Sequence, residues 1–124
     1  VTLGIVPGFN GTQRLPKCIG MNKAKEILFT GKMLTAADAL ELGILNHVTE
    51  PEQLMEEVYA MAGQIAGNSA SAISLVKAAV NAGADMDIDI GKNIELGYMA
   101  ACFGTPDQIE GFASFKEKRA AKFR

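Results

Sequence analysis

The sequence predicts a mainly α-helical segment with one or two short strands. Apolar residues recur at helical spacing from residue 13 onward, Gly and Pro repeatedly interrupt that pattern, and only two short stretches are rich in β-branched residues. With 124 residues, 48% hydrophobic residues and a net charge of −2, the chain is typical of one globular domain. No apolar run approaches the roughly 20 residues that span a bilayer.

The first predicted strand is Val1–Val6, a β-branched apolar run of the kind found in buried strands. Pro7 and Gly8 end it, because Pro donates no ladder hydrogen bond and Gly allows a positive φ. Thr12 is expected to cap the first helix, over 13–19. Backbone N–H groups that meet at such a turn suit the oxygen atoms of a ligand. An ordinary strand–turn–helix corner has the same spacing, so both interpretations stay open here.

Helices are expected along most of the remaining chain. Thr35 and Asp38 are spaced as in a capping box for a helix over 36–42, and Thr105-Pro106-Asp107-Gln108 is the clearest start signal in the chain. A second short strand is expected at 44–48. The other expected starts are Asn22, Pro51, Ser69 or Ser71, and Asp87 or Asp89, and the expected stops are Gly20, Gly31, Gly43, Gly67, Gly83 and Gly104.

Two of these helices have a clear apolar face that we expect to be buried. The residues of these two faces are Leu54, Val58, Met61 and Ile65, followed by Ile73, Val76, Ala79 and Val80.

The alternating carboxylates Asp85, Asp87 and Asp89 do not fit a calcium loop. Such a loop needs Gly at its sixth position and Glu at its twelfth, where this chain has Ile90 and Leu96. We expect the carboxylates to lie at a helix N-terminus, where the helix dipole stabilises them. The sequence therefore indicates no metal site.

Other candidate sites are weak as well. Gly31-Lys32 and Gly91-Lys92 lack the spacing of phosphate-binding loops. His47, the single histidine, has no neighbouring Asp or Cys to orient it as a general base, so a structural role is favoured. Cys18 and Cys102 are isolated, which favours buried, reduced thiols in an intracellular protein over a disulfide.

The segment 116–124 is locally basic. One explanation is a set of exposed cations at a helix C-terminus, each favourable by about 0.3–1 kcal/mol. Another is a site for a ligand with several phosphates. Nucleic-acid binding is poorly supported, because the chain is slightly acidic and lacks interleaved aromatic residues. The charged residues of this segment are Lys116, Lys118, Arg119, Lys122 and Arg124, opposed by Glu117.

Several stretches together resemble the crotonase (enoyl-CoA hydratase/isomerase) family. They are the opening run V-T-L-G-I-V-P-G-F-N-G-T-Q-R-L and the segments 28–31, 36–46 and 110–119. Asn10 departs from the family pattern, which usually has Gly there. The resemblance implies the C-terminal part of the α/β crotonase fold, a superhelix of repeated ββα units followed by helices.

The resemblance also implies a domain organisation and partners. Residues 1–67 would form the end of the crotonase core, with its last strand, turn and following helices, and residues 68–124 a C-terminal helical trimerisation region. It implies a homo-oligomer, either a trimer or a dimer of trimers. From charge, hydropathy and cysteine usage we also expect a cytoplasmic protein that binds neither nucleic acid nor membrane. No cofactor is expected, and coenzyme A would enter as part of an acyl-CoA substrate.

The resemblance assigns substrate-binding positions at both ends of the chain. Pro7, Gly8 and Phe9 match the turn beside the family's substrate site. Phe115 and Lys118 match a C-terminal Phe-x-x-Lys that helps to hold coenzyme A, with the ring on its apolar part and the ammonium on phosphate. No residue is assigned a catalytic role, because the family's catalytic Glu is expected just before the first residue. A second Glu and the oxyanion-hole amides are expected further upstream, so we expect no hydratase activity from this chain alone.

Two functions of different classes follow. The first is a fragment of an enzyme of fatty acid β-oxidation that reversibly hydrates trans-2-enoyl-CoA to 3-hydroxyacyl-CoA, similar to short-chain enoyl-CoA hydratases and 3-hydroxybutyryl-CoA dehydratases. The second is a non-catalytic helical module of crotonase origin that only packs or oligomerises. Within the enzyme class, isomerases, dehalogenases and decarboxylases share the fold, so the reaction type stays open.

Overall fold

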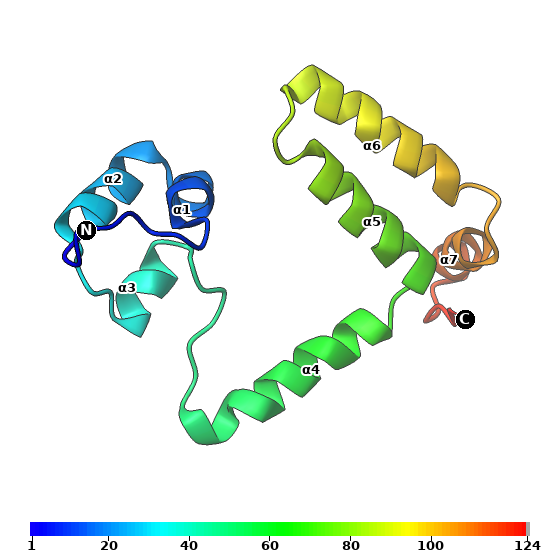
Figure 1. Cartoon of the computed structure of the whole chain (residues 1–124). Helices are drawn as coiled ribbons and strands as arrows, with labels where there is room; N and C mark the ends of the chain where they lie inside the picture. The colour runs from blue at the N-terminus through cyan, green and yellow to red at the C-terminus, as the bar shows by residue number, and fades with distance from the viewer. Residues whose placement is uncertain (124) are drawn as a thin grey trace. The chain divides into compact units, whose positions relative to one another are not determined.

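The computed structural model describes residues 1–123, which form seven α-helices and one 3₁₀-helix joined by turns (Figure 1). The chain divides into two compact units, Val1–Leu54 and Met55–Arg124, and each is described by itself below. In the part of the chain that the structure describes, no helix has both the length and the apolar character needed to cross a membrane.

The first unit contains three α-helices and the 3₁₀-helix. The helix pair α1 and α2 pack against each other, and Ala24 of α2 is fully buried. Gly31, with φ of 66°, ends α2 in the left-handed conformation that glycine adopts without steric cost. The bounds of the elements are α1 Gly11–Ile19, α2 Met21–Thr30, α3 Ala36–Glu41 and η1 Pro51–Gln53.

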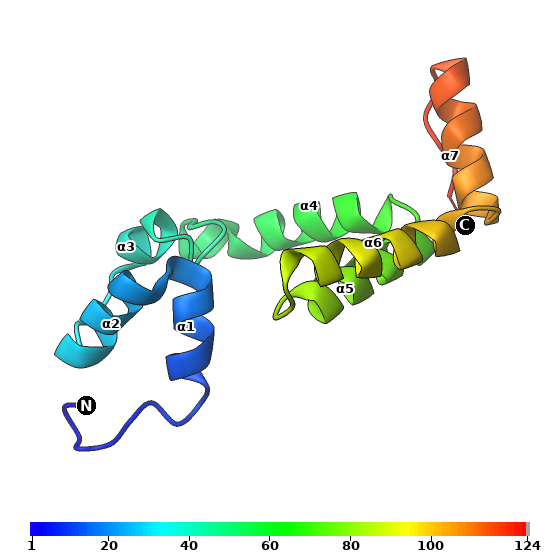
Figure 2. The same ribbon diagram turned by 90° about the horizontal axis from the view of Figure 1, so that it is seen from above.

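The second unit contains the four remaining helices. Helices α5 and α6 lie side by side and antiparallel in both views (Figures 1 and 2), and α7 crosses near the end of this pair. The hydroxyl of Ser69 caps α5 and the carboxylate of Asp87 caps α6, so the structure selects one residue from each pair that the sequence left open. The bounds are α4 Leu54–Ala66, α5 Ala70–Gly83, α6 Ile88–Cys102 and α7 Pro106–Glu117.

Two strong cap predictions are confirmed. Thr35 and Asp38 form a full capping box on α3, with the Thr35 hydroxyl accepting from the Asp38 N–H at 3.1 Å and the Asp38 carboxylate accepting from the Thr35 N–H at 2.9 Å. Thr105 caps α7 by accepting from the Gln108 N–H at 3.2 Å. Gln108 reaches back one residue further than in a standard box, because its side-chain oxygen accepts from the Gly104 N–H at 3.0 Å.

Both predicted strands are wrong for the residues described. Segments 1–6 and 44–48 form turns, bends and irregular structure. Every residue of Val1–Val6 is exposed, and Leu3 reaches 84%. A strand exists only when a neighbouring strand accepts and donates its backbone hydrogen bonds, and residues 1–123 contain no such neighbour. A β-branched composition therefore does not produce a strand here, because residues 1–123 supply no strand to pair with.

Two predicted N-caps are also wrong. Asn10, not Thr12, precedes α1, and Gly20, not Asn22, precedes α2. Asn10 has φ of 63° and makes no capping hydrogen bond through its side chain. Asn is one of the residues that tolerate the left-handed region. Asn10 thus adopts a left-handed conformation without a side-chain capping bond.

The predicted burial of the apolar helix faces fails within this chain. On α4 Leu54 is 52% exposed, and on α5 Val76 and Val80 are 62% and 64% exposed. The thiol of Cys18, expected to be buried, is exposed as well, while Cys102 is half-buried and both cysteines are free. Amphipathic periodicity indicates which face seeks burial, but it does not supply the surface that covers it.

Candidate functional site

The predicted substrate-binding turn lies in the first unit, directly before α1. The ring of Phe9 is 99% exposed and Gly8 is exposed, while Pro7 is half-buried. A Cβ atom added to Gly11 would lie 3.1 Å from the Cβ of Pro7, so Gly11 allows the turn to close against the first turn of the helix. The turn thus presents an unobstructed aromatic ring beside a helix N-terminus.

The other predicted positions lie in the second unit, at the C-terminal end of α7. Phe115 belongs to the last turn of the helix and is 87% exposed. Lys118 directly follows the helix, with φ of 55° in the left-handed region. Phe115 and Lys118 thus lie three residues apart at the end of one helix, and both are exposed. The turn at Pro7, Gly8 and Phe9 belongs to the other unit.

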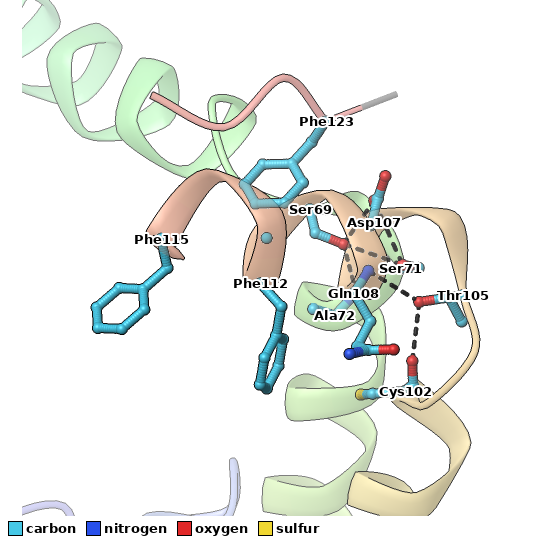
Figure 3. Close-up of a pocket in the computed structure, with 11 residues that line it drawn as sticks. Ser69, Ser71, Ala72, Cys102, Thr105, Asp107, Gln108, Phe112, Phe115 and Phe123 are labelled. Carbon is cyan, nitrogen blue, oxygen red and sulfur yellow. Dashed lines mark hydrogen bonds between the residues drawn. The ribbon is translucent and has the colours of Figure 1, made fainter. Parts of the chain in front are cut away.

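An apolar cavity of about 490 Å³ lies along α7 (Figure 3). Phe112 and Phe115 extend from α7, and the ring of Phe123 comes from the segment that follows the helix. Phe123 lies over Gly111, where an added Cβ would be 3.7 Å from its Cε1 atom. The wall nearest the start of α7 is polar and is formed by residues from α6, α7 and the N-terminus of α5. The ring-lined part of the cavity suits an aromatic or aliphatic group.

The polar wall is held together by Ser69 and Asp107. The Ser69 hydroxyl donates to Asp107 Oδ2 at 2.6 Å and accepts from the Ala72 N–H at 3.2 Å, so one buried hydroxyl caps α5 and joins it to α7. Ser71 Oγ lies 3.0 Å from Ser69 Oγ. Asp107 also lies in the first turn of α7, where the helix dipole favours a carboxylate.

A second polar cluster joins the C-terminal segment to α7. Arg119 binds Glu110 through two parallel bonds, Nη1 to Oε1 at 2.6 Å and Nη2 to Oε2 at 2.9 Å. Its Nε donates to Glu117 Oε2 at 2.6 Å. The Lys122 N–H donates to Glu110 Oε1 at 2.8 Å. Glu110 therefore fixes the chain at two points after it leaves the helix.

Hydrogen bonds lower the pKa values of two carboxyl groups, Glu110 and Asp38. The Arg119 guanidinium, followed by the Lys122 N–H, lowers the pKa of Glu110 from 4.5 to about 2, and the same pairing raises the pKa of Arg119. Hydrogen bonds from the hydroxyl and N–H of Thr35 lower the pKa of Asp38. A carboxylate with a lowered pKa is a weak base, so neither group is suited to abstract a proton near neutral pH.

The structure places two further sequence candidates, His47 and the acidic run over 85–89, at the surface and at a helix start. His47 is exposed. Asp87 caps α6 and Asp89 pairs with Lys92 at 3.0 Å, as the helix N-terminus interpretation predicts. Among residues 1–123, no cluster of three or more His, Cys, Asp or Glu side chains could hold a metal ion.

Sequence reasoning missed Glu110, Ser69 and Asp107 as organisers of this region. The sequence shows Glu117 as the acidic residue of the basic segment, whereas Arg119 also pairs with Glu110, nine positions away. Ser69 was recognised as a cap but not as a link between helices, because its bond to Asp107 spans 38 positions and leaves no local signal.

The chain is similar in structure and in sequence to enoyl-CoA hydratases. Over 98% of its length, the chain superimposes with a TM-score of 0.93 on the crystal structure of enoyl-CoA hydratase from Bacillus anthracis, at 38% identity and covering 47% of that chain. This similarity supports a fold like that of part of an enoyl-CoA hydratase. The family model for enoyl-CoA hydratase/isomerase matches residues 1–124, and the chain belongs to this family.

Two curated relatives are nearly half identical to this chain in sequence. A crotonyl-CoA hydratase of Syntrophomonas wolfei subsp. wolfei is 46% identical over 123 residues, which are 99% of this chain and 47% of that protein. A short-chain-enoyl-CoA hydratase of Clostridioides difficile is 47% identical over 116 residues, which are 94% of this chain and 75% of that protein. The chain thus spans about half the length of the first relative and three quarters of the second.

Proposed function

We propose that this chain supplies part of the acyl-CoA-binding surface of a short-chain enoyl-CoA hydratase, with the end of α7 as its coenzyme A contact. The observation that carries the proposal is the exposed ring of Phe115, which lines an apolar cavity, with the exposed Lys118 at the same helix end. An aromatic ring suits the apolar part of such a ligand, and an ammonium attracts its phosphates. The names of the two curated relatives support short-chain trans-2-enoyl thioesters as the substrates.

We propose that the hydration step depends on groups outside these residues. In the family, two glutamates manage the water and two backbone amides hold the thioester oxygen, stabilising the charge that develops there. Glu110 and Asp38 are unsuited to replace those glutamates, because hydrogen bonds hold both as weak bases. Assignment of the chain to the C-terminal part of the fold, the division at residue 67 and a cytoplasmic location stay predictions.

A second candidate is a non-catalytic helical module that oligomerises. The exposed apolar faces of α4 and α5 favour it, because exposed apolar side chains such as Leu54, Val76 and Val80 gain free energy when a partner covers them. We propose assembly as a trimer or dimer of trimers under either function, so assembly alone does not discriminate between them. Ligand binding does.

The test is a titration of the purified chain with coenzyme A, followed by an absorbance assay with crotonyl-CoA. We expect saturable binding of coenzyme A that Lys118→Gln weakens, and no consumption of the enoyl thioester by the chain alone. If the wild-type chain does not bind coenzyme A, the result favours the oligomerisation module. Turnover that persists through repeated purification and is lost in Glu110→Gln would overturn the assignment of catalysis to other residues.

A further inference from the structure

The backbone at Lys118 is unusual for a residue with a side chain. Lys118 occupies the left-handed region, with φ of 55°, at the position after a helix where glycine is most common. Its N–H donates to Phe115 O at 3.3 Å, and the Arg119 N–H donates to Ser114 O at 3.1 Å. This is the hydrogen-bond pattern of a Schellman motif, built here on a residue whose Cβ disfavours it.

Glu110 supplies the contacts that can hold this corner in place. It binds the Arg119 guanidinium through two bonds and accepts from the Lys122 N–H, so the residues following Lys118 are tied back to α7. The same pairing determines which cations are neutralised. Arg119 faces two carboxylates, Glu110 and Glu117, whereas in residues 1–123 no carboxylate forms an ion pair with the exposed side chain of Lys118.

We propose that Glu110 is a positioning residue for anion binding: by fixing Arg119 and the Lys122 N–H, it holds Lys118 in the left-handed corner with its ammonium available to a phosphate group. The inference rests on the proposed function for its ligand, coenzyme A. Arg119, the stronger phosphate binder by its geometry, has a structural role at this site because its guanidinium already forms a two-bond contact with Glu110.

For the loss of Glu110, a positioning role predicts a change in anion affinity opposite in sign to the change that charge alone predicts. Removing a carboxylate near a phosphate-binding lysine should strengthen anion binding if charge alone matters. If Glu110 positions Lys118, its loss should weaken binding instead. Glu117→Gln is the matched control, because it also removes one carboxylate from Arg119 but leaves both contacts of Glu110 intact.

The experiment measures coenzyme A affinity for the full chain and for Glu110→Gln, Glu117→Gln and Lys118→Gln at low and high salt, with circular dichroism to verify that each variant is folded. We expect Glu110→Gln and Lys118→Gln each to weaken binding by about two- to fivefold, the size of one exposed charge contact. Glu117→Gln should leave affinity unchanged or raise it. NMR should detect faster exchange of the Lys122 amide in Glu110→Gln and a Lys118 backbone coupling that leaves the left-handed range.

The possible failures are distinguishable. If the wild-type chain does not bind coenzyme A, or Lys118→Gln binds as tightly as wild type, the proposed function is wrong at this site. If Lys118→Gln weakens binding but Glu110→Gln does not, the proposed function stands and the positioning role is overturned. An unchanged Lys118 coupling in Glu110→Gln also overturns the positioning role, whatever the affinities are.

Discussion

Gly111 and Gly104 offer the same substitution with opposite expected outcomes. Gly111 lies inside α7, and a Cβ added there would meet only Phe123, at 3.7 Å from Cε1 and 3.9 Å from Cζ. These are ordinary contact distances, so alanine fits without displacing the ring. Gly104 has φ of +80° between α6 and α7, and a Cβ there would have nothing within 4 Å but would strain the backbone.

The magnitudes follow from these two environments. Gly111→Ala should raise the free energy of unfolding by about 1 kcal/mol, since glycine inside a helix is less favourable than alanine by that amount. Gly104→Ala should lower it by about 1–2 kcal/mol, because a left-handed conformation costs that much for a residue with Cβ. Urea unfolding followed by circular dichroism measures both. A loss of stability in Gly111→Ala would refute the fit beside Phe123, and equal shifts of the same sign in both variants would refute the reasoning altogether.

Three further predictions concern the polar contacts. Ser69→Ala should destabilise the second unit by about 1–3 kcal/mol, measured by urea unfolding, because it removes a helix cap and a hydrogen bond to the charged Asp107. Thr35→Ala should lower the helicity of α3, at a cost of about 1 kcal/mol detectable by NMR chemical shifts, since the capping box is lost. Folding lowers the pKa of Glu110 from 4.5 to about 2. The contribution of Glu110 to the free energy of unfolding is therefore complete above pH 4.5 and declines as the pH falls toward about 2. The difference in unfolding free energy between wild type and Glu110→Gln should shrink over that range, and a constant difference would contradict the assignment.

The features that the sequence predicted correctly are those decided within a few residues. Thr105, Pro106 and Gln108 form a helix start because each satisfies or omits a backbone N–H of the first turn, and no distant residue is needed. The same holds for the box at Thr35 and for the stop at Gly31.

The features that could not be predicted depend on surfaces or partners remote in the sequence. Val1–Val6 has the composition of a strand, but strand formation requires a second chain segment with matching hydrogen bonds. The apolar residues of α4 recur at helical spacing, but Leu54 stays 52% exposed in residues 1–123. The contacts of Glu110 with Arg119 join positions nine apart across a helix end, so neither residue signals the other locally.

The second unit has helix caps but little buried apolar surface, and for this reason we expect the carboxylate of Glu110 to matter at the proposed binding site. Among residues 1–123, Ala24 is the sole buried apolar residue, and it lies in the first unit. The end of α7 therefore gains little from a hydrophobic core, and its geometry depends on the hydrogen bonds of Glu110 and of the Schellman corner. A core would restrain Lys118 through many weak contacts, each of them dispensable. Glu110 holds the chain after Lys118 against α7 through Arg119 and the Lys122 N–H, beside the contact of Phe123 with Gly111. The left-handed conformation of Lys118 should therefore become less populated when Glu110 is replaced.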